Sequence, residues 1–452
     1  MKTVAFHNLG CKVNSYEMDI MQQKFIENDF QVVPFDKKAD VYVVNTCTVT
    51  NIADRKSRQM LHRAKKENPD SVVIAVGCYV QTQTKEVSSD ASVDIAIGNN
   101  KKSEIVEILK EYLEKKEKEE KTSGGLLKET FTKVLDINHT PEYESMFLIK
   151  TLDRTRAYIK IEDGCNQFCS YCLIPYARGR VRSRDMEEII REIKELTQKG
   201  YKEFVLTGIH VSSYMITSPN DLSENRLAEL LERIQQIEGV KRIRLSSLEP
   251  RVITRDFVLR ISKLDKLCPH FHLSLQSGSD ETLKRMNRHY TGDDFLRGVK
   301  LLREYFDNPA ITTDIIAGFP GESQKEFEES FDFAKKVSFY EMHVFKYSKR
   351  KGTVAEKLPG QVSDSDKEIR SHRLIELSKK LSGDYRETFL GKIRPVLFEE
   401  ETELFGKKYM SGHTPEYIRV WVENADIKEN EIYNVMLKTG FTDEILTGEI
   451  IK

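Results

Sequence analysis

Hydrophobic residues in the first hundred positions fall into short runs that helical patterns separate. Four of these runs have the length of buried strands: 3–6, 41–44, 72–76 and 94–97. Apolar residues recur at helical spacing near 15–28, where Ser15 is the expected N-cap, and at 52–68. Strands that alternate with helices predict a parallel sheet covered by helices. This part of the chain is therefore expected to be an open parallel-sheet α/β domain.

The same alternation returns after Arg156 and continues for about two hundred residues. Helical patterns such as 186–199 and 323–336 separate the apolar runs. Six runs read as strands: 157–161, 203–206, 242–245, 271–275, 311–316 and 341–345. Six strand–helix units are too few for a closed eight-unit barrel, so we predict an open, partial (βα)6 barrel with its site at the strand C-termini.

The last part of the chain changes to short strand-like runs without helical patterns between them. These runs lie at 394–398, 417–422, 432–437 and 445–450. Their spacing predicts a small antiparallel β-barrel. The Lys- and Glu-rich segment 101–121 is interpreted as a solvated helix, followed by a break at Gly124-Gly125. We therefore expect three domains, at 1–125, 150–384 and 385–452.

Charge and hydropathy exclude some classes of protein. The 452 residues carry a net charge of −1. The sequence contains no run of 18 apolar residues, which is about the length that a membrane-spanning helix requires. The first residues lead directly into a strand pattern, so no signal peptide is expected and the location is predicted to be cytoplasmic. Contact with RNA would then depend on local basic runs, of which 176–184 and 346–351 are candidates. A solvated face is the alternative for both runs.

Three cysteines within eight residues carry the strongest chemical signal. Cys165, Cys169 and Cys172 have the spacing Cys-x₃-Cys-x₂-Cys. Three thiolates bound to a four-iron cluster leave one iron free for another ligand. A zinc site would require a fourth protein ligand, but the next histidine and cysteine are His210 and Cys268. The spacing therefore predicts a 4Fe–4S cluster with one open coordination site.

Three further cysteines follow the ends of predicted strands in the first domain. Cys11, Cys47 and Cys78 occupy equivalent places after three strands, although more than 30 residues separate each from the next. The carboxyl ends of parallel strands border one crevice, so the three thiols are expected to converge on a second cluster. The alternative is that each is a small buried residue, which is the interpretation we give Cys268. His270 and His272 are expected to be structural.

The cysteine spacing resembles the signature of radical S-adenosylmethionine (SAM) enzymes, and the whole chain resembles the radical SAM methylthiotransferases. The order of a three-cysteine domain, a Cys-x₃-Cys-x₂-Cys domain and a TRAM-like barrel is similar to theirs. Further similar stretches lie at 45–50, 206–208, 246–250, 275–279 and 318–322. The resemblance implies that SAM binds the open iron, and Tyr171, Gly208, Gln276 and Asp314 are candidate cofactor contacts. Gln276 and Asp314 are also candidates for substrate contact, and ordinary turn chemistry is the alternative.

The resemblance also implies the reaction. Members transfer a methylthio group to isopentenyl-adenosine in tRNA, to N6-threonylcarbamoyladenosine in tRNA, or to an aspartate of ribosomal protein S12. The segment 10–14 resembles the group that acts on N6-threonylcarbamoyladenosine at tRNA position 37. The other two substrates stay as alternatives. The protein substrate S12 is kept because the C-terminal segment from Lys392 has eight basic and twelve acidic residues, which is unfavourable for a tRNA contact.

Two 4Fe–4S clusters and two SAM molecules per turnover are implied as cofactors. One SAM, at the cluster of Cys165, Cys169 and Cys172, would give the radical that removes the C2 hydrogen, and a second would supply the methyl group. The implied partners are the tRNA anticodon loop, an electron donor such as flavodoxin or ferredoxin, and a sulfur source, with no membrane. A metal-bearing RNA-binding scaffold without turnover is the non-enzymatic alternative.

Overall fold

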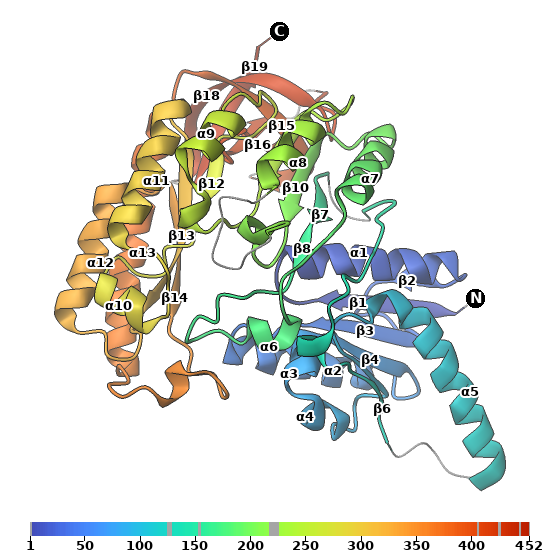
Figure 1. Cartoon of the computed structure of the whole chain (residues 1–452). Coiled ribbons are helices and arrows are strands. Elements are labelled where there is room, and N and C mark those ends of the chain that lie inside the picture. The colour runs from blue at the N-terminus through green and yellow to red at the C-terminus, as the bar shows by residue number, and fades with distance from the viewer. Residues whose placement is uncertain are drawn as a thin grey trace.

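The computed structural model describes residues 2–123, 129–151, 155–216, 226–404, 406–423, 426–442 and 444–451. It is an α/β structure with three regions of sheet (Figure 1). The N-terminal sheet lies at the lower right of that view, the central strands and their helices occupy the left and centre, and the C-terminal barrel lies at the top. The predicted α/β class is confirmed. No helix in the described residues is long and apolar enough to cross a membrane.

The N-terminal sheet has six strands, all parallel, in the order β2-β1-β3-β4-β5-β6. The four predicted strands are confirmed, and the two short edge strands β2 and β6 were missed. The strands are β1 (Thr3–Asn8), β2 (Gln31–Val33), β3 (Val41–Thr46), β4 (Val72–Gly77), β5 (Ile95–Ile97) and β6 (Phe131–Lys133).

The helices of this region differ from the prediction at two places. Helix α1 (Lys12–Glu27) begins before Ser15, so the predicted N-cap is wrong: Cys11 occupies that position, and the Ser15 hydroxyl instead accepts a hydrogen bond from Asn8. Helix α5 (Ile105–Ser123) is not simply solvated, because Ile108 and its apolar neighbours pack into the sheet core. The other helices are α2 (Asn51–Glu67), α3 (Cys78–Thr82) and α4 (Thr84–Ser88). The predicted break at 124–125 lies outside the described residues.

The six predicted central strands are confirmed as two parallel three-stranded sheets, β7-β10-β11 and β12-β13-β14. Parallel bridges from Ile243 to Leu267 and from Leu248 to Leu273 connect the two, so the strands follow one another as an open partial barrel. The strands are β7 (Ala157–Lys160), β10 (Glu203–Thr207), β11 (Arg242–Leu245), β12 (His270–His272), β13 (Ala310–Ala317) and β14 (Glu341–Lys346).

Helices cover the outside and both edges of this partial barrel. Tyr16 and Ile20 of α1 share a core with Ile159 of β7, so the N-terminal region packs at the β7 edge. Helix α13 (Asp364–Glu387) packs against β14 at the other edge, where the Ser378 hydroxyl accepts from the Met342 amide at 3.0 Å. The remaining helices are α7 (Met186–Gln198), α8 (Leu227–Gln235), α9 (Arg255–Ile261), α10 (Asp280–Arg285), α11 (Gly292–Tyr305) and α12 (Gln324–Val337).

The C-terminal region is a closed barrel with the strand order β15-β16-β17-β19-β18. It differs from the predicted antiparallel barrel at one pair, because β19 runs antiparallel to β18 and thereby lies parallel to β17. Strand β16 was not predicted, because it begins with two lysines and has Gly412 as its next-to-last residue. The strands are β15 (Ile393–Leu404), β16 (Lys407–His413), β17 (Arg419–Glu423), β18 (Ile432–Thr442) and β19 (Ile445–Ile450).

Tyr417, which precedes β17, attaches this barrel to the amino ends of the central strands. Its ring lies 5.1 Å from the guanidinium of Arg156 and 4.7 Å from that of Arg244, and it stacks on His413. Arg242 also donates hydrogen bonds to the carbonyls of Pro395 and His413. Cation–π contacts at partly desolvated sites contribute about 0.5–2 kcal/mol each. The carboxyl ends of the central strands, where a site is expected, are left free of the C-terminal barrel.

Candidate active site

Cys165, Cys169 and Cys172, which we call the loop triad, lie between the short strand β8 (Glu162–Asp163) and helix α6 (Ile174–Arg178). Each sulfur faces a hydrogen-bond donor: the Gln167 amide at 3.5 Å from Cys165, the Ile174 amide at 3.4 Å from Cys172, and the Arg288 guanidinium at 3.1 Å from Cys169. Donors of this kind stabilise thiolate sulfur and tune the potential of a cluster that it holds.

Cys11, Cys47 and Cys78, which we call the sheet triad, follow β1, β3 and β4. Cys11 is the N-cap of α1 and Cys78 is the first residue of α3, so both lie at helix N-termini, where the helix dipole favours negative charge. Gly10 has φ +116°, and a Cβ added there would lie 3.3 Å from the Cys47 Cβ. The loops that hold Cys11 and Cys47 therefore pack closely, as the strand order predicts.

Burial acts on the thiols of both triads in the same direction. It raises the pKa of Cys47 to about 12, with the charge of Cys78 adding to the shift. It also raises the pKa of Cys172 to about 12, with the charge of Cys169 adding to it. Burial raises the pKa of Cys11 as well, although Arg178 opposes it. Such thiols become thiolates when a metal neutralises them, so the donor set fits a metal centre that releases protons on binding.

Neither triad draws its three sulfur atoms together as a single bound ion would. Within the described part of the chain, only His272, Asp314 and His343 bring three ligand atoms within 4.8 Å of one another. Neither cysteine triad does so. Three sulfurs on one zinc ion, each about 2.3 Å from the metal, would lie within about 4 Å of one another. Sulfurs that bind three different irons of a cube lie farther apart than this, so the failure of both triads to meet the 4.8 Å limit argues against a compact single-ion site.

Arg178 lies between the two triads and is fully buried. Its guanidinium donates to the Cys78 sulfur at 3.3 Å, to Glu17 at 2.6 Å and to Asp163 at 3.2 Å. Lys160 bonds the same two carboxylates at 2.8 and 2.6 Å. Although burial opposes it, Lys160 and then Arg178 lower the pKa of Asp163 to about 2. The loop that follows the loop triad is thereby joined to the sheet triad by a buried network of charges.

This network changes the interpretation of the basic run 176–184. Arg178, Arg182 and Arg184 are at most 5% exposed, and Arg184 pairs with buried Glu192 at 2.5 Å. Their predicted contact with RNA phosphate is wrong, because carboxylates inside the protein already occupy these guanidinium groups. Only Arg180 of this set is exposed, with its guanidinium 4.3 Å from the ring centre of Phe168.

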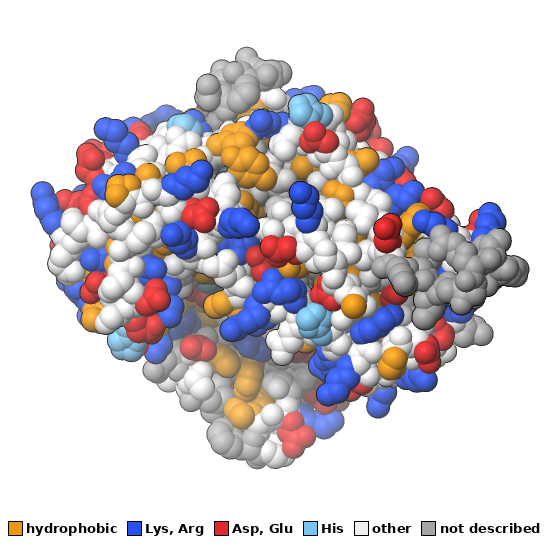
Figure 2. Space-filling model, turned by 90° about the horizontal axis from the view of Figure 1, so that it is seen from below, with side chains coloured by type: hydrophobic (Ala, Val, Ile, Leu, Met, Phe, Trp, Pro, Cys, Tyr) orange, Lys and Arg blue, Asp and Glu red, His pale blue; other side chains and the backbone are white. Residues whose placement is uncertain are grey.

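The second basic run, 346–351, divides in the same way. Arg350 is 3% exposed and donates to Asp54 at 2.7 Å and to Thr48 at 2.8 Å, so it joins the loop after β14 to the N-terminal region. Lys349 and Lys351 are exposed. Seen from below, the molecule shows basic and acidic side chains mixed over its surface (Figure 2). RNA contact, if it uses these runs, is restricted to their exposed members.

The predicted cofactor contact Gly208 has an explanation within the protein. A Cβ at this position would lie 2.7 Å from Oε2 of Glu162, a residue that the sequence analysis did not single out. The same oxygen accepts a hydrogen bond from the His210 amide at 2.7 Å, and burial raises the pKa of Glu162 to about 8. Its other oxygen, Oε1, is buried without a protein partner. Glu162 thus offers a polar atom three residues before Cys165.

The other three predicted contacts lie in different surroundings. Tyr171 packs edge-to-face against Phe319 at 6.3 Å, and its pKa is raised by burial and by the charge of Cys169, so it borders the loop triad. Gln276 has φ +67° and extends the sheet, donating its amide proton to the Asp314 carbonyl at 2.8 Å. The Asp314 side chain instead faces His272. Cys268 is buried, as predicted.

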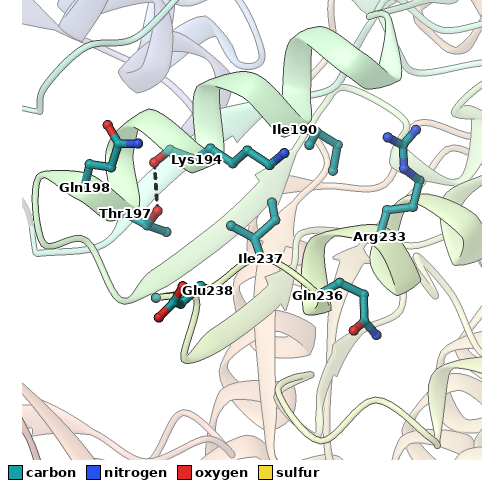
Figure 3. A pocket seen from close by; sticks show the side chains of 9 residues that line it. Ile190, Lys194, Thr197, Gln198, Arg233, Gln236, Ile237 and Glu238 are labelled. Atoms are coloured by element: carbon teal, nitrogen blue, oxygen red, sulfur yellow. Dashed lines mark hydrogen bonds between the residues drawn. The ribbon is translucent and has the colours of Figure 1, made fainter.

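A surface hollow lies away from both triads (Figure 3). It has a volume of about 680 Å³ and lies between the outer helices α7 and α8, next to Gly239 before the amino end of β11. Its side chains come from these helices and the loop that follows them: Ile190, Lys194, Thr197, Gln198, Arg233, Gln236, Ile237 and Glu238. Since sites of such barrels lie at the carboxyl ends of the strands, this hollow is not the active site.

Comparison with known proteins agrees with this geometry. Residues 159–334 match the radical SAM superfamily, and residues 3–98 match the family described as uncharacterized protein family UPF0004. A solved structure of the radical SAM methyltransferase TsrM from Kitasatospora setae has the same fold, with a TM-score of 0.53 and 14% identity over 76% of this chain and 73% of that one. The superfamily implies a 4Fe–4S cluster and SAM.

Relatives of known name extend over nearly the whole chain. Threonylcarbamoyladenosine tRNA methylthiotransferase MtaB of Bacillus subtilis is 40% identical over 98% of this chain and 95% of its own length. The protein of the same name from Aquifex aeolicus is 40% identical over 90% and 95%. The tRNA-2-methylthio-N(6)-dimethylallyladenosine synthase of Finegoldia magna is 31% identical over 98% and 93%. The chain therefore belongs to the radical SAM tRNA methylthiotransferase family.

Proposed function

We propose that this enzyme adds a methylthio group to C2 of N6-threonylcarbamoyladenosine at position 37 of tRNA. The observation that carries the choice of substrate is the gradient of similarity. Three relatives named for threonylcarbamoyladenosine are 36–40% identical, whereas those named for dimethylallyladenosine are 31–35% identical. The segment 10–14, which includes Cys11 and Lys12, supports the same choice. Dimethylallyl-type adenosine and ribosomal protein S12 are the alternatives.

The enzyme uses two 4Fe–4S clusters in this proposal, one on each cysteine triad. The sulfur positions support it, because neither triad brings its three ligand atoms within 4.8 Å of one another as a single-ion site would. When bound, the clusters and SAM would supply the electron, the radical chemistry at C2, the sulfur and the methyl group. The chain's own part is to hold the thiolates, to exclude water and to align the two triads. Arg178, which bonds Cys78 and also Asp163, two residues before Cys165, performs this alignment.

Tyr171, Gly208 and Gln276 contact SAM in this proposal, and Glu162 joins them. Its unpartnered Oε1, close in sequence to Cys165, is placed to accept a hydrogen bond from a cationic amino group. The proposal keeps three domains, 1–125, 150–384 and 385–452. The anticodon loop of tRNA is the macromolecular substrate, and a flavodoxin or ferredoxin supplies electrons. A separate sulfur source replaces the sulfur that is transferred from the cluster on the sheet triad. Since its substrate is tRNA, the enzyme acts in the cytoplasm.

The test is a nucleoside analysis of total tRNA from cells with and without the gene. Loss of the 2-methylthio form of threonylcarbamoyladenosine, with the unmethylthiolated nucleoside accumulating, is the expected result. Complementation with the wild-type gene should restore it, and complementation with a Cys169→Ala gene should not. The proposed substrate would be wrong if the 2-methylthio form of threonylcarbamoyladenosine persisted. Loss of the methylthio group from dimethylallyladenosine or from S12 would then identify the alternative substrate.

A further inference from the structure

Three side chains outside both triads converge on the inner face of the central strands. His272, Asp314 and His343 lie on the adjacent strands β12, β13 and β14, and their ligand atoms lie within 4.8 Å of one another. Strand register explains this: Asp314 pairs directly with His343, and His272 pairs with Thr312, two residues before Asp314 and on the same face. Such a cluster on a concave face has no structural need for two imidazoles and a carboxylate.

The polar atoms of this cluster are incompletely used by the protein. His272 bonds the Thr312 hydroxyl through Nδ1 at 3.0 Å, but its Nε2 is buried without a hydrogen-bond partner and lies 3.4 Å from Asp314. His343 is about half exposed, with side-chain accessibility of 48%, and Asp314 is 30% exposed. A buried ring nitrogen without a partner beside two accessible polar groups indicates a place that a polar ligand completes.

Lys12 adds an exposed cation within electrostatic range of this cluster. It is the first residue of α1, next to Cys11, and the charge of Asp314 acts on it. The structure gives it no ion-pair partner within the described ranges. The charge of Lys12 reaches His270, as do those of His272 and His343. An ammonium within electrostatic range of Asp314 favours an anionic group, and Asp314 adds an acceptor for a hydroxyl.

The ring geometry argues for such a ligand over a metal ion. The imidazoles of His272 and His343 are stacked, with centroids 5.7 Å apart and planes inclined by 24°. The nitrogen lone pairs of two nearly parallel rings point in similar directions. They therefore cannot both point at one zinc ion at the required distance of about 2.0–2.1 Å. Two N–H donors arranged in this way can instead bracket the two oxygens of a carboxylate.

We propose that Lys12, His272, Asp314 and His343 bind the amino-acid substituent on N6 of the substrate adenine, with Lys12 and the imidazoles on its carboxylate and Asp314 on its hydroxyl. The proposal rests on the proposed function and names the residues that determine its specificity. Lys12 adjoins Cys11 of the sheet triad, so a substituent held there keeps the adenine ring close to the proposed source of sulfur. A dimethylallyl group, which has no polar atom, would leave all four side chains without partners.

The experiment uses cluster-loaded protein and synthetic anticodon stem-loop RNAs. These carry threonylcarbamoyladenosine, plain adenosine, dimethylallyladenosine or an N6-methylcarbamoyl group that lacks the carboxylate. Wild-type protein is expected to bind the threonylcarbamoyl RNA about tenfold to a hundredfold more tightly than the methylcarbamoyl RNA, as expected for a charge-assisted contact. In His343→Leu and Lys12→Met this ratio falls towards one, whereas affinity for the plain adenosine RNA does not change.

Matched variants separate recognition from damage to the fold. His343→Gln keeps a donor and should recover part of the ratio, and His372→Leu, which changes an exposed histidine of α13, should leave it unaltered. Iron content and thermal unfolding are measured for every variant, and only variants that match the wild type in both are compared.

Three outcomes contradict the inference. Wild-type protein that prefers dimethylallyladenosine overturns the proposed function and the inference together. Preference for threonylcarbamoyladenosine that survives in both His343→Leu and Lys12→Met overturns the inference alone. A stoichiometric zinc or manganese ion that binds the wild type and is lost in His343→Leu would assign the cluster to a metal instead.

Discussion

The loop triad and the sheet triad hold the same number of thiols by opposite means. Cys165, Cys169 and Cys172 lie within eight residues of one loop, and an amide in this loop and one just after it face two of the sulfurs. Cys11 and Cys47 come from different strand ends and meet only when the parallel sheet has formed. The comparison teaches that one site depends on local backbone and the other on the whole N-terminal fold, so disturbances of the fold should affect the two sites unequally.

Removing one cysteine from each triad tests the comparison with the largest effect. Cys169→Ala should abolish reductive cleavage of SAM and with it all methylthiolation, because the cluster that binds SAM is lost. Cys47→Ala should still form 5′-deoxyadenosine but transfer no sulfur. In each variant, iron should fall from about eight to about four atoms per chain. Chromatography of the reaction products and iron analysis measure both results, and equal loss of SAM cleavage in the two variants would refute separate roles.

Arg178→Met should lower the stability of the protein and affect the sheet triad more than the loop triad. It leaves buried Glu17 and Asp163 without one of their partners, and breaking such a pair costs about 3–5 kcal/mol in the free energy of unfolding. Since Arg178 also bonds Cys78, the sheet triad should lose iron before the loop triad does. Denaturant unfolding and iron content are the measurements. Arg180→Met is the matched control, since Arg180 is exposed and should change stability by less than about 1 kcal/mol. A similar loss in both variants would contradict the role of the network.

Glu162 gives the neighbourhood of the loop triad its own pH dependence. Its pKa is raised to about 8 in the folded protein, so between pH 6 and pH 8 the folded state holds a proton that the unfolded state has released. Stability should therefore fall as pH rises through this window, by about 2–3 kcal/mol from this group. Glu162→Gln is always neutral and should remove that decrease. Unfolding at pH 6 and pH 9 measures it, with the exposed Glu187→Gln as control. An unchanged pH slope in Glu162→Gln would show that the group is ionised at neutral pH.

The smallest effect is expected at the exposed basic residues near the surface of the site. Lys349→Ala and Lys351→Ala should each weaken binding of tRNA by less than about tenfold and reduce the slope of log affinity against log salt by about 0.9, the value for one phosphate contact. Filter binding at several salt concentrations measures this. Lys335→Ala on α12 is the control, because it changes an exposed lysine of a different element. Equal effects at all three positions would indicate contact through overall charge.

The sequence predicted the repeating architecture well because strand and helix periodicities are local. All six strands of the partial barrel are where the apolar runs predict them. The edge strands β2 and β6 and the charged β16 were missed, since pairing in the tertiary structure stabilises them more than their composition does. The start of α1 was placed too late because a cysteine, which is not a usual N-cap, begins it.

The site could be predicted where its residues are close in the sequence, and not where the tertiary structure brings distant residues together. The loop triad is predicted directly by the Cys-x₃-Cys-x₂-Cys spacing. Burial of Arg178 and Arg350 does not, because Glu17 and Asp54, their partners, are distant in the chain. For the same reason, no pattern joins His272, Asp314 and His343: their proximity depends on the register of three strands, which the sequence specifies only through the complete fold.

Tyr417 has a consequence for how a long RNA reaches the enzyme. A C-terminal barrel connected only through the end of α13 could rotate relative to the central strands. The Tyr417 ring, which contacts two guanidinium groups, fixes its orientation. Nucleic acid bound to the outer face of the C-terminal barrel would then approach the active site in one fixed orientation. The direction of approach would be set by Tyr417 together with Arg242, which bonds the carbonyls of Pro395 and His413, and would not depend on the length of the connecting peptide.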